Sequence, residues 1–189
     1  MRLSKSSVVV LDRDGVINED SPDFIKTPAE WHAIPGSLEA IARLHQAGIT
    51  VVVATNQSGV GRGLFTIDTL WDIHRKMLAE VSEAGGYIAR IFFCLHGPDD
   101  NCDCRKPKPG LLYQAAEYLA CGLQNMIVVG DSVRDLESAV AVGARPVLVR
   151  TGKGRAAEKL LMDHADFDNL EVYDDLASAV DKLMSEMTE

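Results

Sequence analysis

Two aspartates directly follow an apolar run near the start of the chain. Asp12 and Asp14 bracket an arginine in the stretch SVVVLDRDGVINED. Unpaired carboxylates beside a core are costly to desolvate, so a cation must share their site. Asp131 and Asp135 follow a second apolar run, MIVVG, and Lys106 lies in a basic segment between the two runs. Carboxylates from two strand ends with a nearby lysine favour a Mg²⁺ site that also takes phosphate oxygens.

Three of the four cysteines form a second constellation with a histidine. Its members are Cys94, His96, Cys102 and Cys104. Three thiolates and one imidazole match a closed tetrahedral structural zinc site, in which no position is left for catalysis. We therefore expect Zn²⁺ to hold a loop over residues 94–104, against the alternative of four unrelated reduced side chains. Cys121 stands apart at a predicted helix end and is expected to be a packing residue.

Strands and helices alternate along the chain, and these elements must position the polar residues. Apolar runs predict strands at 8–11, 49–54, 87–94, 126–131 and 145–150. Periodic apolar positions and stop signals predict four helices. The first covers residues 37–47 with Ser37 as N-cap, and the second runs from an N-cap at Thr66 to a stop at Gly85-Gly86. The other two cover residues 109–119 and 134–142. Beyond Thr151 we expect a helix, a short apolar segment and a terminal helix. Apolar strands between helices predict a doubly wound α/β fold with a parallel sheet covered on both faces.

The residues that follow the strands are expected to lie together, because ligands of such sheets bind beyond the carboxyl ends of the strands. Four strand ends deliver DRDG, TNQSG, the cysteine segment leading into RKPKPG, and GDSVRD. They bring to one edge Asp12, Asp14, Thr55, Lys106, Asp131 and Asp135. An aspartate after a strand is more often a turn residue or a helix N-cap than a ligand. The combination after four successive strands favours a functional site over that alternative.

Composition limits the remaining functions. With 189 residues, 47% of them hydrophobic, the chain fits one domain, residues 1–189, with a substantial core. It has no long apolar run, and its first apolar stretch is too short for a signal peptide, so we expect a cytoplasmic protein without a membrane partner. The net charge of −9 disfavours nucleic acid, while a local basic patch can still bind a small anion.

Four segments, LDRDG, ATNQSG, CRKPKPG and GDSVRD, resemble in order and spacing the motifs of the haloacid dehalogenase-like phosphatases, over about residues 8–150. Within that superfamily, DRDGVIN, TNQSGVGRG and the cysteine loop before the basic segment resemble the D-glycero-D-manno-heptose 1,7-bisphosphate 7-phosphatases and their relatives, the histidinol-phosphate phosphatases. The resemblance implies a Mg²⁺-dependent phosphatase that acts on a phosphorylated sugar. This sugar would belong to the synthesis of nucleotide-activated heptose, which is used for lipopolysaccharide. Histidinol phosphate or another small sugar phosphate is the alternative.

The resemblance also implies a role for each catalytic residue. Asp12 would be the nucleophile that forms an aspartyl-phosphate, and Asp14 the acid/base. Thr55 would hydrogen-bond the phosphoryl oxygens and Lys106 would stabilise their charge. Asp131, Asp12 and the main-chain carbonyl of Asp14 would hold Mg²⁺. Asp135 would orient Lys106 or the waters of the metal.

Substrate selection must come from surface loops, since no stretch of the chain is long enough for a cap domain. The candidate substrate-binding residues are Asp20, Asp23, Asn56, Gln57, Ser58, Arg62, Arg105 and Ser132. The guanidinium fork of Arg105 is expected to bind a second phosphate or hydroxyl groups, against the alternative of a surface arginine near Asp103. We expect the protein to act as a monomer.

Two hypotheses from other classes, and one further enzyme, are weaker. A receiver-type signalling module is also doubly wound, with a phosphorylatable aspartate, a threonine and a lysine at strand ends. Asp14 and the cysteine cluster argue against it, because a persistent phospho-aspartate has no use for a general acid two residues on. A zinc-dependent interaction protein without catalysis would not need every catalytic position filled. A nucleic-acid end phosphatase conflicts with the acidic balance of the chain.

Overall fold

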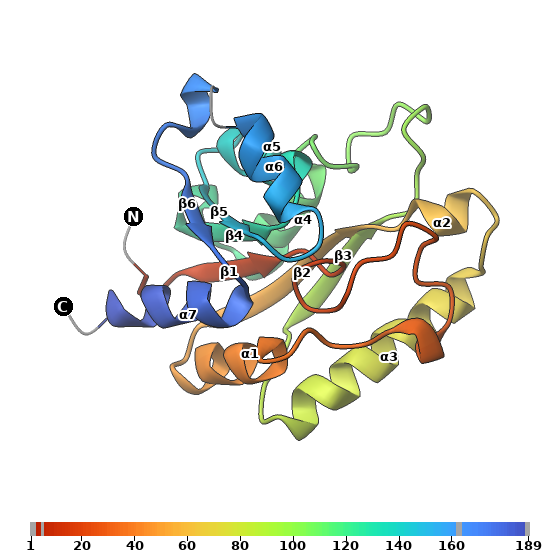
Figure 1. Ribbon diagram of the computed structural model, residues 1–189, viewed down its shortest axis with the longest axis horizontal. Coiled ribbons are helices and arrows are strands. Elements are labelled where there is room, and N and C mark those ends of the chain that lie inside the picture. Colours follow the sequence, from red (N-terminus) through yellow and green to blue (C-terminus); the bar gives the residue numbers. More distant parts are fainter. Residues whose placement is uncertain (1–2, 5, 162–163, 188–189) are drawn as a thin grey trace.

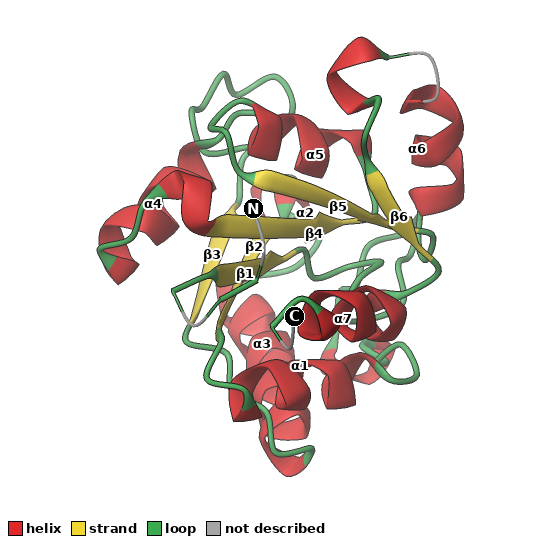
Figure 2. Ribbon diagram, turned by 90° about the vertical axis from the view of Figure 1, so that its left-hand side faces the viewer, coloured by secondary structure: helices red, strands yellow, loops and turns green. Residues whose placement is uncertain are grey.

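The computed structural model describes residues 3–4, 6–161 and 164–187. Its centre is a 6-stranded parallel sheet in the order β3-β2-β1-β4-β5-β6 (Figures 1 and 2). The strands are β1 Val8–Leu11, β2 Thr50–Asn56, β3 Arg90–Cys94, β4 Met126–Gly130, β5 Arg145–Val149 and β6 Glu171–Tyr173. The predicted doubly wound α/β fold is confirmed.

Helices cover both faces of the sheet (Figure 2). One face carries α1 Ser37–Gln46, α3 Ile67–Glu83 and α7 Leu176–Ser185, and the other carries α4 Gly110–Leu119, α5 Val133–Val140 and α6 Gly154–Leu161. Side chains of a strand alternate between the faces, so Val9 and Leu11 of β1 belong to the core under α1, α3 and α7. Val8 and Val10 pack into the core on the α4 side. Burial on both faces explains why these strands are continuously apolar.

The order of the strands brings the ends of three of them together. β1 pairs with both β2 and β4, and Leu11 lies opposite Val53 and Val129. The chain order reverses at β1, which is the position where such sheets form a crevice for ligands. Asp12, Thr55 and Asp131 therefore emerge side by side at this edge.

The helix starts agree with the sequence in one case and differ in another. Thr66 caps α3, and its side chain accepts a hydrogen bond from the backbone nitrogen of Thr69. At α1 the predicted cap is wrong, because Gly36 occupies the N-cap with φ 82°. The hydroxyl of Ser37 instead donates to the carbonyl of Ile17 at 2.7 Å and ties α1 to the loop after β1.

Element bounds differ where local signals were ambiguous. The third strand begins at Arg90 rather than at residue 87, and the exposed Tyr87 precedes it. The short helix α2, Ser58–Gly61, and the strand β6 were not predicted. Both are too short for a hydrophobic period to reveal them. Among the described residues, the longest helices lack the length and apolar character that a membrane span requires.

Candidate active site

A cavity of about 320 Å³ opens at the carboxyl ends of the strands. Of the predicted site residues it is lined by Asp12, Asp14, Asp20, Thr55, Asn56, Gln57, Ser58, Arg62, Arg105, Lys106, Asp131, Ser132 and Asp135. Asp23 is exposed and does not line this cavity, while its neighbours Ser21, Pro22 and Phe24 do. The lining also includes Arg134 and Lys153, which were not predicted.

Three carboxylates meet at the floor of the cavity. Oxygens of Asp12, Asp131 and Asp135 lie within 4.8 Å of one another. Burial, with the charges of Asp135 and Asp14, raises the pKa of Asp12 to about 6 against the attraction of Lys106. Burial and the charges of Asp12 and Asp135 raise the pKa of Asp131 to about 8. Such a crowd of carboxylates fits a divalent cation, which relieves both the desolvation and the repulsion.

Lys106 is the buried counter-charge of this cluster. Its Nζ atom lies 3.0 Å from Oδ1 of Asp12 and 2.5 Å from Oδ1 of Asp135. The same atom donates to the carbonyl of Ala54 at 2.7 Å, so its three donors are satisfied. Burial alone would lower the pKa of Lys106, but the two carboxylates raise it above its ordinary value. The ammonium group is thus charged and fixed beside the predicted nucleophile.

Two glycines let the backbone close around Asp131. A Cβ atom on Gly15, with φ +85°, or on Gly152, with φ +54°, would lie 2.1 Å from Oδ2 of Asp131. The backbone nitrogen of Lys153 donates to the same oxygen at 2.8 Å. The turn TGKG after β5 therefore orients a predicted metal ligand. The sequence signal for this turn is Gly-Lys-Gly directly after an apolar strand.

Asp14 is surrounded by hydrogen-bond donors. Arg13 donates to both of its oxygens, and Asn18 and Gln57 each donate to one of them. Burial favours a raised pKa, but the charge of Arg13 and the hydrogen bonds from Asn18 and Gln57 hold the pKa of Asp14 below its ordinary value. The predicted acid/base is therefore a well-oriented carboxylate.

The amides of Asn56 and Gln57 have structural partners. Asn56 accepts from the backbone nitrogen of Lys106 and donates to its carbonyl oxygen, both at 3.1 Å. Gln57 donates to Oγ1 of Thr55 at 2.9 Å and accepts from Arg13 at 3.1 Å. Both residues line the cavity as expected, but these contacts make them supports of the neighbouring site residues.

Ser132 likewise has an internal partner. Its hydroxyl and its backbone nitrogen donate to Oδ2 of Asp135 at 2.6 and 3.0 Å. Since Ser132 is the N-cap of α5, this contact closes the first turn of that helix. The other oxygen of Asp135 pairs with Lys106.

Three guanidinium groups stand at the mouth of the cavity. Arg62, Arg105 and Arg134 come from three different loops or helix starts. Burial and the charges of Arg134 and Arg62 lower the pKa of Arg105, so the groups are close enough to repel one another. Within the part of the chain that the structure describes, no carboxylate pairs with any of the three. Such a cluster is suited to an anion from solution.

Lys153 and Asp20 form an ion pair across the cavity mouth, with 2.6 Å between Nζ and Oδ2. This contact ties the loop after β1 to the turn after β5. Asp20 lines the cavity as predicted, but its charge already has a partner. Ser58, which is 7% exposed, belongs to the first turn of α2 at another side of the cavity.

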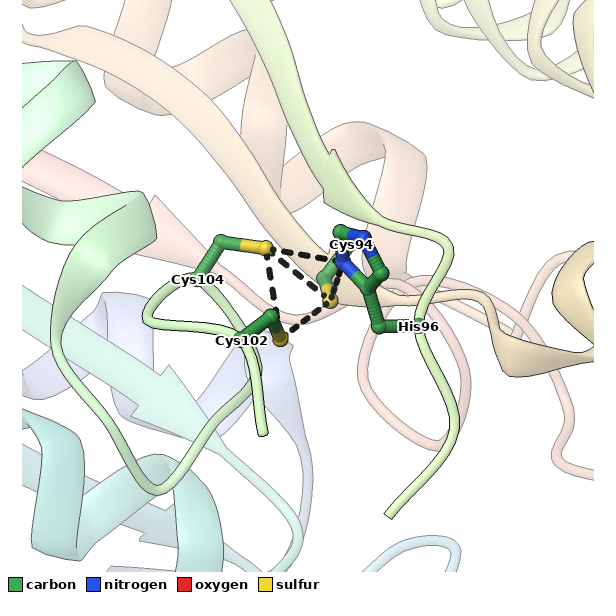
Figure 3. A group of neighbouring side chains, drawn as sticks. All are labelled: Cys94, His96, Cys102 and Cys104. Atoms are coloured by element: carbon green, nitrogen blue, oxygen red, sulfur yellow. Dashed lines mark hydrogen bonds between the residues drawn. The ribbon is translucent and has the colours of Figure 1, made fainter. Parts of the chain in front are cut away.

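The cysteine cluster is assembled from the last residue of β3 and the loop that follows it (Figure 3). The Sγ atoms of Cys94, Cys102 and Cys104 lie 3.2 to 3.7 Å apart, and Nδ1 of His96 lies 3.5 and 3.4 Å from the first and last of them. Two sulfurs bound tetrahedrally to zinc at about 2.3 Å are separated by about 3.8 Å. The cysteines are free thiols whose spacing fits such an ion. Nη1 of Arg105 donates to the carbonyl of His96 at 3.0 Å, which connects the cluster to the cavity.

Taken together, the floor of the cavity offers the carboxylate of Asp12 as the predicted nucleophile, a fixed ammonium group and a group of carboxylates for a divalent cation. A second carboxylate, Asp14, stands next to the nucleophile for proton transfer. Phosphoryl transfer needs mainly positioning and neutralisation of charge, which these residues supply.

Comparisons with known proteins agree with this chemistry. A family model described as HAD-hydrolase-like matches residues 103–179. The chain is 52% identical to the D-glycero-beta-D-manno-heptose-1,7-bisphosphate 7-phosphatase of Pseudomonas putida, over 94% of this chain and 99% of that protein. It is 51% identical to the protein of the same name from Pseudomonas aeruginosa, over 94% and 98% of the two chains.

A solved structure is similar over nearly the whole chain. The D,D-heptose 1,7-bisphosphate phosphatase from B. bronchiseptica, complexed with magnesium and phosphate, has a TM-score of 0.90 and 48% identity, covering 95% of this chain and 99% of that one. The fold and the phosphatase activity thus agree with the sequence analysis. The chain belongs to the haloacid dehalogenase-like hydrolases, in the family of the heptose-1,7-bisphosphate 7-phosphatases.

Proposed function

We propose that the chain removes the 7-phosphate of D-glycero-β-D-manno-heptose 1,7-bisphosphate, in the synthesis of nucleotide-activated heptose for lipopolysaccharide. Relatives of 46 to 52% identity bear the name of this β-anomer phosphatase. The observation that carries the proposal is the pairing of a phosphoryl-transfer floor with a separate arginine cluster at the mouth of one cavity. A substrate with two phosphates can use both, whereas histidinol phosphate has one phosphate and leaves the arginines without an anion.

Asp12 is the nucleophile of the proposed mechanism. Its carboxylate oxygen forms a bond to phosphorus as the bond to the sugar oxygen breaks, and Asp14, which has to be protonated when the substrate is bound, gives its proton to that oxygen. Water then attacks the aspartyl-phosphate, Asp14 takes its proton, and inorganic phosphate leaves Asp12. Thr55 and Lys106 bind the phosphoryl oxygens, and Asp135 keeps Lys106 in place.

Mg²⁺ fits the carboxylate cluster, and Asp12, Asp131 and the main-chain carbonyl of Asp14 would hold it. When bound, it supplies positive charge to the phosphoryl oxygens and to the crowded carboxylates. The donor set supports this assignment, since the oxygens are hard ligands and the pKa of Asp131 is raised to about 8 by burial and neighbouring carboxylates.

Zn²⁺ fits the cysteine cluster as a structural ion held by Cys94, His96, Cys102 and Cys104. Its proposed role is to fix the loop over residues 94–104. The carbonyl of His96 in this loop accepts a hydrogen bond from Arg105, so fixing the loop also holds that guanidinium group. Binding requires deprotonated thiols, so the ion replaces the contacts between the free side chains.

The arginine cluster, defined as Arg62, Arg105 and Arg134, is proposed to bind the distal phosphate of the substrate. The role expected for Arg105 alone is thereby assigned to three arginines. Three guanidinium groups at one mouth, none of which pairs with a carboxylate of the described residues, support this interpretation over that of a surface arginine near Asp103. Asp103 pairs with Lys108.

The substrate is tested by phosphate release with Mg²⁺ from both anomers of heptose 1,7-bisphosphate, from histidinol phosphate and from fructose 1,6-bisphosphate. We expect kcat/KM for the β anomer to exceed that for histidinol phosphate by about a thousandfold, or roughly 4 kcal/mol of transition-state discrimination. Comparable slow rates on all four would leave a phosphatase whose substrate is different.

We also propose that the chain acts as a cytoplasmic monomer without a nucleic-acid or membrane partner. Its net charge of −9 disfavours a nucleic-acid partner or an anionic membrane. Light scattering of the purified protein tests the oligomeric state, and the mass of a dimer would contradict the proposal.

A further inference from the structure

Both oxygens of the Asp14 carboxylate are held by side chains that the proposed reaction does not use. Arg13 donates to Oδ1 from Nε and Nη2, at 3.0 and 2.9 Å, and to Oδ2 from Nη2 at 2.9 Å. Gln57 donates to Oδ2 at 2.9 Å. The carboxylate cannot turn about its Cβ–Cγ bond without breaking several of these contacts.

Arg13 and Gln57 are also joined to each other and to Thr55. Nη2 of Arg13 donates to Oε1 of Gln57 at 3.1 Å, and Nε2 of Gln57 donates to Oγ1 of Thr55 at 2.9 Å. The network therefore links Asp14, the proposed acid/base after β1, to Thr55, which is proposed to bind phosphoryl oxygens at the end of β2. Its geometry is fixed by the planar fork of the guanidinium group and the planar amide.

The burial of Arg13 indicates a role other than stability. The residue is 0% exposed, and among the described ion pairs its carboxylate partner is Asp14. Its Nη1 atom is buried and has no hydrogen-bond partner among the described residues. A buried ion pair with an unsatisfied donor contributes little to folding, because desolvation of the charges opposes their attraction. What the pair does provide is a single orientation of Asp14.

We infer that Arg13 and Gln57 are positioning residues, which aim Asp14 at the leaving oxygen and then at the attacking water. This inference rests on the proposed role of Asp14 as acid/base. In the first half-reaction, the bond from Asp12 to phosphorus forms, the bond to the leaving oxygen breaks, and the proton of Asp14 goes to that oxygen. In the second, the water oxygen bonds to phosphorus, its proton goes to Asp14, and the bond to Asp12 breaks.

p-Nitrophenyl phosphate separates these two half-reactions. Its leaving group departs as a stable anion, so the first half-reaction needs no proton from Asp14, whereas the attack of water still needs the base. If Asp14 is misaligned, phosphoenzyme therefore forms rapidly and breaks down slowly. The expected signature is a burst of nitrophenolate followed by slow turnover.

The experiment mixes the full chain with Mg²⁺ and p-nitrophenyl phosphate and follows nitrophenolate from the first turnover. For Gln57→Met we expect a burst of about one nitrophenolate per chain and a later rate at least about tenfold below that of the unchanged protein, with KM lowered in about the same proportion, so that kcat/KM changes less than about threefold. Arg13→Met is expected to behave likewise, and Arg13→Lys, which keeps the charge and loses the fork, to recover part of the rate. Gln46→Met, at an exposed position, is the matched control and should behave like the unchanged protein.

The outcomes distinguish a failed inference from a failed mechanism. Turnover of Gln57→Met within about twofold of the unchanged protein would overturn the inference, and so would a parallel loss of burst and turnover, which indicates a merely structural role. Asp14→Asn is measured alongside. If it stalls after its burst while Gln57→Met does not, the inference alone fails; if it turns over normally, the acid/base role fails and the inference with it. Should circular dichroism find Arg13→Met unfolded, Gln57→Met decides.

Discussion

The ammonium group of Lys106 and the carboxylate of Asp12 lie 3.0 Å apart, and the two side chains are only 5% and 14% exposed. The lysine thus stands beside the proposed nucleophile before any substrate arrives. It cannot neutralise the floor of the cavity alone, since Asp131 and Asp135 add two further carboxylates. A phosphate group can approach this floor only with additional positive charge, which is the physical reason for a divalent cation.

Replacing the nucleophile should abolish turnover. Asp12→Asn keeps the size of the side chain but removes the anionic oxygen, so no aspartyl-phosphate can form. We expect phosphate release from the heptose bisphosphate to fall to the rate without enzyme. Asp23→Asn is the matched control, because Asp23 lies outside the lining of the cavity, and it should keep nearly full activity. Substantial turnover by purified Asp12→Asn would assign the nucleophile to another residue.

Mg²⁺ should stabilise the protein more at high pH than at low pH. The folded protein raises the pKa of Asp12 to about 6 and that of Asp131 to about 8, above the ordinary value of 3.8. Without metal, these carboxylates therefore destabilise the fold increasingly as the pH rises from about 4 to about 8, when they must ionise. Mg²⁺ binds the ionised form and removes this penalty.

Thermal unfolding with and without Mg²⁺ measures this effect. The gain in Tm should be larger at pH 8 than at pH 6, because protons compete with the metal for the same oxygens at the lower pH. In Asp131→Asn, most of the dependence on pH should disappear. A gain that is equal at both values, or larger at pH 6, would contradict a site built on these carboxylates.

The sequence predicted the floor of this site well and its mouth poorly. Asp12 and Asp131 directly follow apolar strands and Thr55 lies near the end of another, so the topology of a parallel sheet alone brings them together. Arg134 and Lys153 follow strands too, but a single charged side chain in a helix start or a turn does not differ in sequence from a solvated one. Their place became visible only once the strand order had fixed which loops share a mouth.

The roles of amides and the starts of elements were harder still to predict. Asn56 and Gln57 were expected to bind substrate, since an amide in a strand-end loop can serve a ligand or its own fold equally well. The structure gives both of them internal partners. Gly36 is the N-cap of α1 because it adopts a positive φ. The sequence alone does not distinguish a glycine in this role from a glycine in an ordinary turn.

Loss of zinc should loosen Arg105 while leaving the chemistry intact. We expect about one zinc per chain in the purified protein and much less in Cys102→Ser, because a closed tetrahedral site tolerates few changes of ligand. The variant should have a lower Tm and a raised KM for the heptose bisphosphate, since the carbonyl of His96 no longer holds the guanidinium group. Turnover of p-nitrophenyl phosphate at saturation should change far less.

The matched control for this prediction is Cys121→Ser. Cys121 lies outside the cysteine cluster and packs with the core on the α4 side. It should retain zinc and the unchanged KM. Zinc-free protein with an unchanged Tm and KM would mean that the four side chains do not form a metal site.

Arg134 should matter for substrates with a second phosphate and not for simple phosphate esters. A charge-assisted hydrogen bond to phosphate contributes about 2 kcal/mol, so Arg134→Met is expected to lower kcat/KM for the heptose bisphosphate roughly thirtyfold, mainly through KM. The same variant should hydrolyse p-nitrophenyl phosphate at nearly the unchanged rate, because the floor of the cavity is intact. Arg155→Met, which changes an exposed arginine outside the lining, is the matched control. Equal losses on both substrates would instead place Arg134 at the transferring phosphate, and the distal phosphate would then depend on Arg62 and Arg105 alone.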